Sequence, residues 1–438
     1  MASGYANIFK IPELRNRILL TLFLLGVYRI GVFIPVPGTD RSALASFFQQ
    51  GAAGTLFGLY DMFSGGALEQ FSVFTLGIMP YITSSIIIQL MNVVIPSLEA
   101  LSREGEAGRR KITQYTRYGT IVIATVQGLA ISTTLEAMKV QDLSVVVHPG
   151  WGFRIMAIIT LTAGTTFLMW LGEQMTERGI GNGISLIITS GIIASAPAGA
   201  IKLFTQVREG EMNLLGVLLL GALMVAIIAG IVLCERGQRR IPVQYAKRVV
   251  GRKVYGGQTA HLPLKLNTAG VIPPIFASAL MMFPATIATF YPAEWLDNLL
   301  SGFVPGVVLY DTAYVALIVF FCYFYTAVTF NPDDVAENMK KYNGFIPGIR
   351  PGKQTAEYID YILTRITLGG AIYLSVVCIM PTLLRTKFGV PIYFGGTGLL
   401  IVVGVALDTV AQIESHLLTR EYEGLLGSKG TRIRGRRG

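Results

Sequence analysis

Charged residues are scarce in this sequence. Only 14% of its 438 residues are Asp, Glu, Lys or Arg, whereas soluble domains carry roughly 25%. Hydrophobic residues make up 52% of the chain, and many fall in runs of about twenty, the length that crosses a bilayer as a helix. Alternating segments of about ten residues, which would mark a membrane β-barrel, are missing. The sequence therefore predicts an all-α polytopic membrane protein.

Residues for covalent, metal or nucleotide chemistry do not occur in the patterns that such chemistry needs. No CxxC pair is present and the histidines are far apart in sequence, which disfavours a disulfide framework and a zinc site. The sequence also lacks a GxxxxGK[ST] phosphate loop and an HExxH metal motif. We therefore expect a protein that is not an enzyme and that uses no cofactor or metal ion. The cysteines are Cys234, Cys322 and Cys378, and the histidines are His148, His261 and His416.

Charged residues inside the predicted membrane spans are few. Arg29 lies in the first span and Asp408 in the last. No span carries a pair of carboxylates that would bind Na⁺ or relay protons. This pattern disfavours a secondary transporter of a small solute, which stays the alternative function. The glycine-rich stretch ERGIGNGIS, residues 177–185, opens a span instead of following a strand, which favours a tight turn over a nucleotide site.

The apolar runs predict ten membrane spans. If the N-terminal tail faces the cytoplasm, most of the 36 lysines and arginines also face it, as the positive-inside rule requires. Both termini are then cytoplasmic. The predicted spans are residues 18–36, 71–95, 118–135, 152–172, 183–203, 213–234, 269–290, 309–329, 367–384 and 397–417.

Five spans in each half of the chain would relate the halves as an inverted repeat, with a pseudo-symmetry axis in the membrane plane. This count predicts a set of domain boundaries. They are a cytoplasmic N-terminal segment 1–17, a first half 18–203, a hinge loop 204–212, a second half 213–417 and a basic cytoplasmic tail 418–438.

Two predicted cytoplasmic loops, 235–268 and 330–366, are longer than most connections. The first contains ERGQRRIPVQYAKR, which is typical of a basic β-ribbon followed by a return strand, and the second contains the turn sequence GFIPGIRPG. Basic residues in such loops can simply set the orientation of the protein in the membrane. Eight of them in the first loop exceed what orientation needs, which favours a docking surface for an acidic or nucleic-acid partner.

The stretch LYDMFSGGALEQFSVFTLGIMPY, residues 59–81, predicts a short broken helix before the second span. Two glycines and two acidic residues interrupt it, so it is too short to cross a bilayer. Nearby, Ile78 and Ile82 share one helix face, as do Ile188 and Ile192 in the fifth predicted span. Such isoleucines can face lipid or a neighbouring helix, or form a hydrophobic constriction. The pattern alone leaves these alternatives open.

Several blocks of the sequence occur together in one known family. They are MFSGGAL, LGIMPYITSSIIIQL, EGEAGRRKITQYTRYGT, LGEQMTERGIGNGIS, ERGQRRIPVQYAKR, HLPLKLNTAGVIPPIFAS, FNPDDVAENMKKYNGFIPGIRPG and YFGGTGLLIVVGVALD. In this order they resemble bacterial SecY, the large subunit of the protein-conducting channel, from about residue 10 to 420. The resemblance implies ten transmembrane helices in two pseudo-symmetric halves around a central pore, with a short re-entrant plug helix near 58–68.

The resemblance also implies site residues. A pore ring would be formed by Ile78, Ile82, Ile188, Ile192, Ile275 and Ile401. The plug would include Met62, Phe63, Ser64, Gly65 and Gly66. A lateral gate would carry Thr83, Gln127 and Asn267. Partner docking would use Arg239, Arg240, Arg252, Lys253 and Arg350.

The function that the resemblance implies is passage of unfolded secretory polypeptides across the bacterial cytoplasmic (inner) membrane, with lateral release of membrane-protein segments into lipid. The implied partners are the small membrane subunits SecE and SecG, the SecA motor ATPase, the ribosome through its RNA, signal sequences and nascent polypeptides, and membrane lipid. Because the chain carries no motif for nucleotide hydrolysis, we expect the work of transport to come from these partners or from the membrane potential.

Overall fold

The structure is a computed structural model. It describes residues 11–40, 44, 61, 63–137, 139–140, 143–210, 213–245, 248–250, 253–255, 259–281, 284, 307–388 and 396–427. These residues belong to two compact units. Unit 1 is Met1–Ser84, Thr116–Ser195 and Ile401–Gly438, and unit 2 is Ser85–Tyr115 and Ala196–Leu400.

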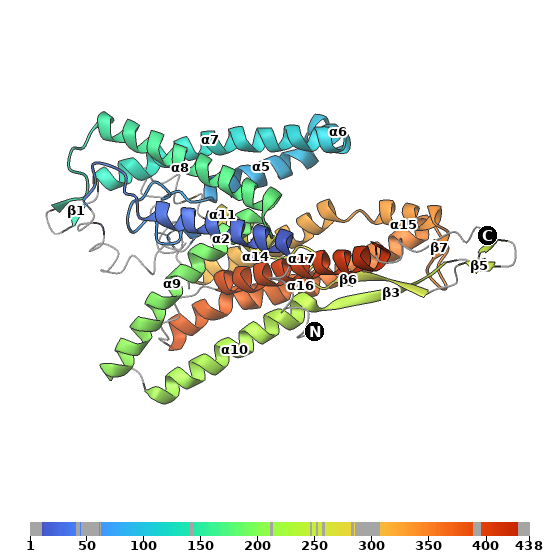
Figure 1. Cartoon of the computed structure of the whole chain (residues 1–438). Helices are drawn as coiled ribbons and strands as arrows, with labels where there is room; N and C mark the ends of the chain where they lie inside the picture. Colours follow the sequence, from blue (N-terminus) through green and yellow to red (C-terminus); the bar gives the residue numbers. More distant parts are fainter. Residues whose placement is uncertain are drawn as a thin grey trace, which may run out of the picture. The chain divides into compact units, whose positions relative to one another are not determined.

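Helices dominate both units, and ten of them overlap the ten predicted spans (Figure 1). Among the residues that the structure describes, seven helices are long and apolar enough to cross a membrane, and a bent pair of helices would make an eighth. The number of ten spans therefore stays a prediction, although the predicted class of helical membrane protein is confirmed. The ten helices are α2 (Pro12–Val32), α5 (Met79–Val94), α7 (Glu106–Ala137), α8 (Trp151–Arg178), α9 (Gly183–Arg208), α10 (Leu214–Arg236), α11 (Ile272–Met281), α14 (Val308–Thr329), α16 (Lys353–Phe388) and α17 (Gly396–Gly427).

The bent pair consists of α5 and α6 (Pro96–Arg103), whose axes differ by 100°. Pro96 is the first residue of α6, and Ile95 before it is extended, with φ −101° and ψ 111°. A proline disfavours helical backbone in the residue before it and has no N–H to continue the helical hydrogen bonds. The chain therefore turns sharply at this point.

The second predicted span, 71–95, begins eight residues before the helix that the structure contains. Residues 71–78 form successive turns, and the helix begins only at Met79. The backbone hydrogen bonds of this stretch go to the chain that follows α2, because the Val73 amide donates to Ile34 O and the Val36 amide donates to Phe71 O, both at 2.9 Å. Backbone groups paired in this way do not need a helix to satisfy them.

Three further boundaries differ from the expected ones. The predicted loop 330–366 contains helix α15 (Pro332–Lys341), strand β7 (Gly344–Phe345) and the first turns of α16. Helix α9 continues to Arg208, into the expected hinge loop 204–212. Helix α17 continues to Gly427, into the expected tail 418–438. Amphipathic or basic helical residues extend these helices beyond the apolar runs that the prediction counted.

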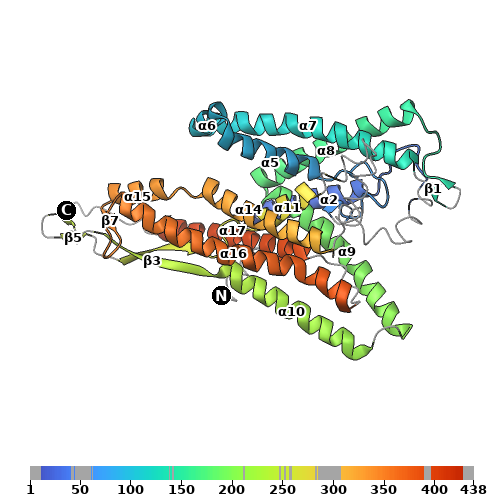
Figure 2. The same cartoon turned by 180° about the vertical axis from the view of Figure 1, so that it is seen from behind.

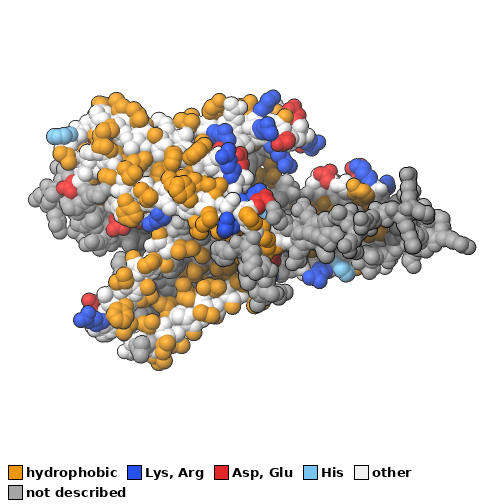
Figure 3. Space-filling view, in the orientation of Figure 1, with side chains coloured by type: hydrophobic (Ala, Val, Ile, Leu, Met, Phe, Trp, Pro, Cys, Tyr) orange, Lys and Arg blue, Asp and Glu red, His pale blue; other side chains and the backbone are white. Residues whose placement is uncertain are grey.

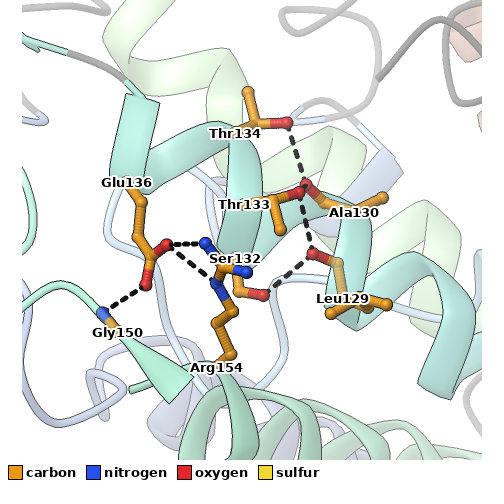
Figure 4. Close-up of polar contacts among 8 residues, drawn as sticks. All are labelled: Leu129, Ala130, Ser132, Thr133, Thr134, Glu136, Gly150 and Arg154. Carbon is orange, nitrogen blue, oxygen red and sulfur yellow. Dashed lines mark hydrogen bonds and ion pairs between the residues drawn. The ribbon is translucent and has the colours of Figure 1, made fainter. Parts of the chain in front are cut away.

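Two ion pairs join α7 to α8 in unit 1. Arg117 and Glu173 form a bidentate pair with both N···O distances 2.8 Å. Farther along the two helices, Arg154 donates to Glu136 Oε2, and Glu136 Oε1 accepts the Gly150 amide at 2.8 Å (Figure 4). The Glu136 side chain is only 9% exposed. Because each carboxylate is satisfied by a guanidinium fork, the pairs fix the register of the two helices.

The apolar core of unit 1 lies between α7, α8 and the connections around them. Phe71 and Leu76 from the turn region and Leu161 from α8 are 0% exposed, and the Phe71 ring is tilted against the Phe153 ring. The two-stranded sheet of β1 (Lys139–Val140) and β2 (Leu143–Ser144) follows α7. The cluster of buried residues is Val36, Leu44, Phe71, Leu76, Ala124, Leu135, Val145, Val146, Phe153, Ala157 and Leu161.

Unit 2 carries a three-stranded antiparallel sheet in the order β6-β3-β7. Strand β3 (Gln238–Tyr245) pairs with β6 (Thr259–Lys265) along its length, and the two strands lie side by side in both views (Figures 1 and 2). The predicted basic ribbon with a return strand is thus confirmed. Strands β4 (Arg248–Val250) and β5 (Lys253–Tyr255) form a separate pair.

One face of this sheet packs on α15 and α16. Ile241 and Val243 alternate with exposed residues of β3 and contact apolar residues of both helices. The buried cluster is Ile241, Val243, Leu264, Met339, Ile346, Ile359, Ile362 and Ile366. In the same unit, α14 packs against α11 and α16. The apolar core therefore holds the sheet on the extended end of α16.

The helices keep large apolar side chains on their outer surfaces. Figure 3 shows hydrophobic side chains over the visible flanks of the helices and charged side chains gathered near α6 and the start of α7. The charged side chains there include the exposed pairs Arg103–Glu99 and Arg110–Glu106. An exposed apolar belt with charges at helix ends is the surface that a lipid bilayer requires.

Candidate functional site

The short broken segment before α5 is folded back on unit 1. Within the described residues, Asp61, Phe63 and Ser64 are helical, and Gly65 and Gly66 follow with φ of 71° and 85°. Such left-handed backbone favours glycine. Ser64 is 0% exposed and Phe63 is 4% exposed. Met62 and residues 58–60 lie outside the described residues.

Two side chains of α2 hold the backbone of this segment. The Tyr28 hydroxyl donates to Ser64 O, and Arg29 Nη1 donates to Gly65 O, both at 2.9 Å. In the sequence, Arg29 stands out only as a rare charge inside a predicted span. Contacts between residues 36 positions apart leave no local pattern in the sequence. The only sign of the role of Arg29 is that an arginine at membrane depth is costly and is usually functional.

Asp61 closes the segment on itself. Its Oδ1 accepts the amides of Leu68 and Glu69, each at 3.0 Å, and its carbonyl accepts the Ser64 hydroxyl at 3.0 Å. Burial of the carboxyl group raises the pKa of Asp61 to about 6, and the two amide hydrogen bonds oppose this rise. The Asp61 carboxyl group is thus satisfied as an acceptor by two backbone donors.

All six predicted ring isoleucines are buried. Ile192 and Ile401 are 0% exposed, and the largest exposed fraction of the six is 7%, at Ile275. Five of them belong to unit 1 and Ile275 belongs to unit 2. Ile78 and Ile82 lie one helical turn apart, since the Ile82 amide donates to Ile78 O. The ring itself stays a prediction.

The three predicted gate residues differ in their hydrogen bonding. Thr83 bonds within its own helix, donating to Met79 O at 3.0 Å. Gln127 Oε1 is buried, with no hydrogen-bond partner in the described part of the chain. Asn267 Nδ2 donates to Glu235 Oε1 at 2.7 Å and to Gly270 O at 2.9 Å. Asn267 thus ties the turn before α11 to the end of α10, a contact that the sequence did not reveal.

The predicted docking residues lie in the loops of unit 2. Arg239 and Arg240 are exposed on β3, opposite Leu264 and Pro263 of β6. Arg350 is exposed in the turn between β7 and α16. Arg252 lies outside the described residues, and only the backbone of Lys253, in β5, is described. The sheet and its core give Arg239 and Arg240 a fixed base.

The turn at Arg350 is well defined. Gly348 and Gly352 on either side adopt φ of 82° and 110°. The Thr355 hydroxyl donates to Arg350 O at 2.9 Å, and the Ile349 amide donates to Ile346 O at 3.1 Å. Since backbone and side-chain bonds fix the turn, the guanidinium extends from a rigid base.

Comparison with known proteins places these features in one family. The SecY family profile matches residues 72–410. A protein translocase subunit SecY from Escherichia coli strain K12 is 50% identical over 418 residues, covering 94% of each chain. A protein translocase subunit SecY from Pseudomonas aeruginosa is 51% identical over 420 residues, covering 95% of this chain and 94% of the relative.

Solved structures share the fold. A chain described as the structure of a protein conducting channel matches with a TM-score of 0.65 at 18% identity, covering 95% of this chain and 94% of that one. The Sec61 chain of the canine ribosome-channel complex from the endoplasmic reticulum matches with a TM-score of 0.61 at 18% identity, with the same two coverages. The profile match and the identity of about half over nearly the full length both show that this chain belongs to the SecY family.

Proposed function

We propose that this chain is the channel-forming subunit of a protein translocase, which passes unfolded polypeptides across the membrane and releases apolar segments sideways into lipid. The observation that carries the proposal is the identity of 50% to SecY over 94% of both chains. The site geometry fits this function, because unit 1 combines buried aliphatic positions with a re-entrant segment folded against α2 and α9.

The aliphatic positions suit a channel for polypeptides. A transported chain presents every kind of side chain, so a specific binding site would trap some of them. A collar of Ile78, Ile82, Ile188, Ile192, Ile275 and Ile401 would contact each side chain weakly and still exclude hydrated ions by dewetting. In the resting state, the plug segment 58–68 would add a second seal.

Lateral release requires a gate that opens at low energetic cost. Thr83, Gln127 and Asn267 are the gate positions that we propose. Hydrogen bonds between membrane helices are worth only ~0.6 kcal/mol on average. An apolar signal helix that gains lipid contact can compete with bonds of this strength.

Replacing Asn267 with Leu tests the gate. The change removes the donor to Glu235 of α10 and to Gly270 O. If the loss of the tie to α10 favours the open state by ~0.6 kcal/mol, we expect that state to gain about threefold in population. Export of a precursor with a defective signal sequence should rise accordingly in a reporter assay. Thr268→Val is the matched control, because the neighbouring Thr268 hydroxyl bonds locally, to Lys265 O. Equal export by N267L and the unsubstituted chain would contradict the gate role.

We propose that the exposed basic loops of unit 2 dock the ribosome and the SecA motor. The canine Sec61 structure is a ribosome-channel complex, and Arg239, Arg240 and Arg350 are exposed on a rigid base in this chain. Phosphates of ribosomal RNA favour such arginines. We further propose SecE and SecG as membrane partners, and a location in the bacterial inner membrane with both termini cytoplasmic.

A secondary transporter is not favoured by these findings. Within the residues that the structure describes, no group of three or more His, Cys, Asp or Glu gathers to hold a metal ion, and no carboxylate pair appears among the buried residues. The family instead indicates a translocase subunit, and we propose that its partners supply the energy.

Crosslinking of a stalled secretory precursor tests the proposed function. A photoreactive residue at each of the six isoleucines, one at a time, should crosslink to the precursor in the assembled translocase. Exposed Ile159 on α8 is the control position, and it should not react. If no isoleucine position reacts while the precursor is being transported, the collar does not line the path.

A further inference from the structure

We propose that Tyr28 and Arg29 of α2, together with Gly191 of α9, form a clamp that holds the plug segment in its closed position. The inference rests on the proposed function of residues 58–68 as a plug. It adds the residues that determine how readily the plug leaves. All of them belong to unit 1.

The clamp grips two consecutive carbonyl groups. Tyr28 donates to Ser64 O and Arg29 donates to Gly65 O, both at 2.9 Å. Ser64 is 0% exposed and Tyr28 is 1% exposed, so water does not compete for the bond between them. The bond from Arg29 to Gly65 O is partly buried. A carbonyl that lost its donor here would be left unsatisfied or would have to move to water. The two bonds therefore favour one position of the segment.

The charge of Arg29 is committed to this contact. Within the described residues, no ion pair involves Arg29. Its guanidinium lies 6.0 Å from the Tyr28 ring centroid and 5.9 Å from the Phe33 ring centroid. Aromatic faces and a carbonyl oxygen thus solvate a cation in an apolar helix. An arginine at this depth is costly and usually functional.

Gly191 provides the surface against which the segment is held. A Cβ added to Gly191 would lie 3.0 Å from Gly65 Cα and 3.2 Å from Gly65 N. A Cβ added to Gly65 would lie 2.7 Å from Gly191 Cα and 2.7 Å from the Tyr28 hydroxyl. The two backbones touch directly, so neither glycine accepts a side chain without a shift of the backbone. The close approach brings the two carbonyls within reach of α2.

Hydrogen bonds from Asp61 tie the gripped segment together. Asp61 Oδ1 accepts the Leu68 and Glu69 amides, and the Gly66 amide donates to Asp61 O at 3.0 Å. These bonds join Asp61 to the residues that follow Ser64 and Gly65. A hold on Ser64 and Gly65 therefore restrains more of the segment than these two residues.

The clamp can be weakened in two ways. Tyr28→Phe with Arg29→Met removes both donors and keeps most of the side-chain volume. Gly191→Ala keeps both donor side chains and crowds Gly65 and the Tyr28 hydroxyl, which would lie 3.2 Å from the added Cβ. Arg29→Lys retains a charged donor, and Gly26→Ala on the same helix α2 is a steric control, because nothing lies within 4 Å of an added Cβ there.

Two readouts separate the clamp from the plug hypothesis. The first is the resting ion conductance of the complete translocase in lipid bilayers. The second is the alkylation rate of Ala67→Cys by a membrane-impermeant maleimide, in a chain whose Cys234, Cys322 and Cys378 are replaced by Ser. Ala67 is 0% exposed, so the closed segment should protect a cysteine there. The deletion of 58–68 serves as the conductance reference.

We expect about tenfold higher conductance and about tenfold faster alkylation in both Y28F/R29M and G191A, with R29K and G26A near the unsubstituted values. If the deletion leaks but Y28F/R29M and G191A stay tight and protect the thiol introduced by A67C, the clamp is wrong and the plug remains. If the deletion does not leak, the plug function fails, and the alkylation rates still decide whether Tyr28, Arg29 and Gly191 hold the segment.

Discussion

Deleting residues 58–68 is expected to raise the resting ion conductance of the reconstituted translocase by an order of magnitude or more. Only the aliphatic collar would then remain to seal the pore. Because the side chains at such a constriction fluctuate, ions would pass intermittently. Phe63 and Ser64 of the segment are almost completely buried within unit 1. Their deletion would therefore leave a space that water can enter. Planar-bilayer recording of single complexes measures the effect directly.

The control for this deletion must show that the channel still folds. A deleted chain should still assemble with its membrane partners and transport a precursor, because the remaining helices of unit 1 keep their own core around Phe71, Leu161 and Phe153. A conductance unchanged from that of the intact chain, in complexes that transport normally, would exclude the plug. Loss of assembly would instead show that the segment is needed for folding.

Reversing the charge of Arg350 is expected to reduce motor-driven export by about tenfold or more, while insertion of membrane proteins by the ribosome falls much less. One buried or well-oriented charge contact at an interface is worth ~2–5 kcal/mol when one partner is removed. The turn that carries Arg350 is fixed by Thr355 and by two glycines in left-handed backbone. A glutamate at this position would repel the negatively charged group of the motor that Arg350 would contact.

Lys353→Glu is the matched control for Arg350→Glu. It changes the net charge equally and lies three residues away, in the first turn of α16, where a negative charge is favourable. In vesicles, export driven by ATP and the motor is compared with insertion of a polytopic substrate by ribosomes. Equal loss of both activities in R350E would point to misfolding, and equal loss in K353E would point to general electrostatic attraction instead of a specific contact.

Much of the fold follows from local sequence. Apolar runs of about twenty residues predicted helices in the right places, since a backbone in lipid must satisfy its own hydrogen bonds. The prediction failed where pairing is not local. Residues 71–78 are as apolar as a span, yet they form turns because their backbone bonds reach the chain after α2. Helix α15 and the first part of α16 are polar, and so they were counted as a loop.

The site was predictable only in part. Family blocks pointed to the isoleucines, to Gly65 and Gly66, and to Arg350. The isoleucines are buried and Arg350 is exposed, and the roles of all these residues stay predictions. The partners of these residues were not predictable. Tyr28 and Ser64 are 36 residues apart, and Asn267 and Glu235 are 32 apart. No periodicity connects residues at such separations, because each contact depends on how distant parts of the chain pack together.

The ribbon of β3 and β6 connects two membrane helices, α10 and α11, with only short links at each end. Strand β3 begins at Gln238, just after α10 ends at Arg236, and β6 ends at Lys265, shortly before α11 begins at Ile272. The Leu266 amide donates to Gly237 O at 2.8 Å, so the pairing continues to the base of the hairpin. Paired strands hardly stretch or shear. Because the two strands are paired down to their base, we expect a force on the far end of the hairpin to act on the ends of α10 and α11 together.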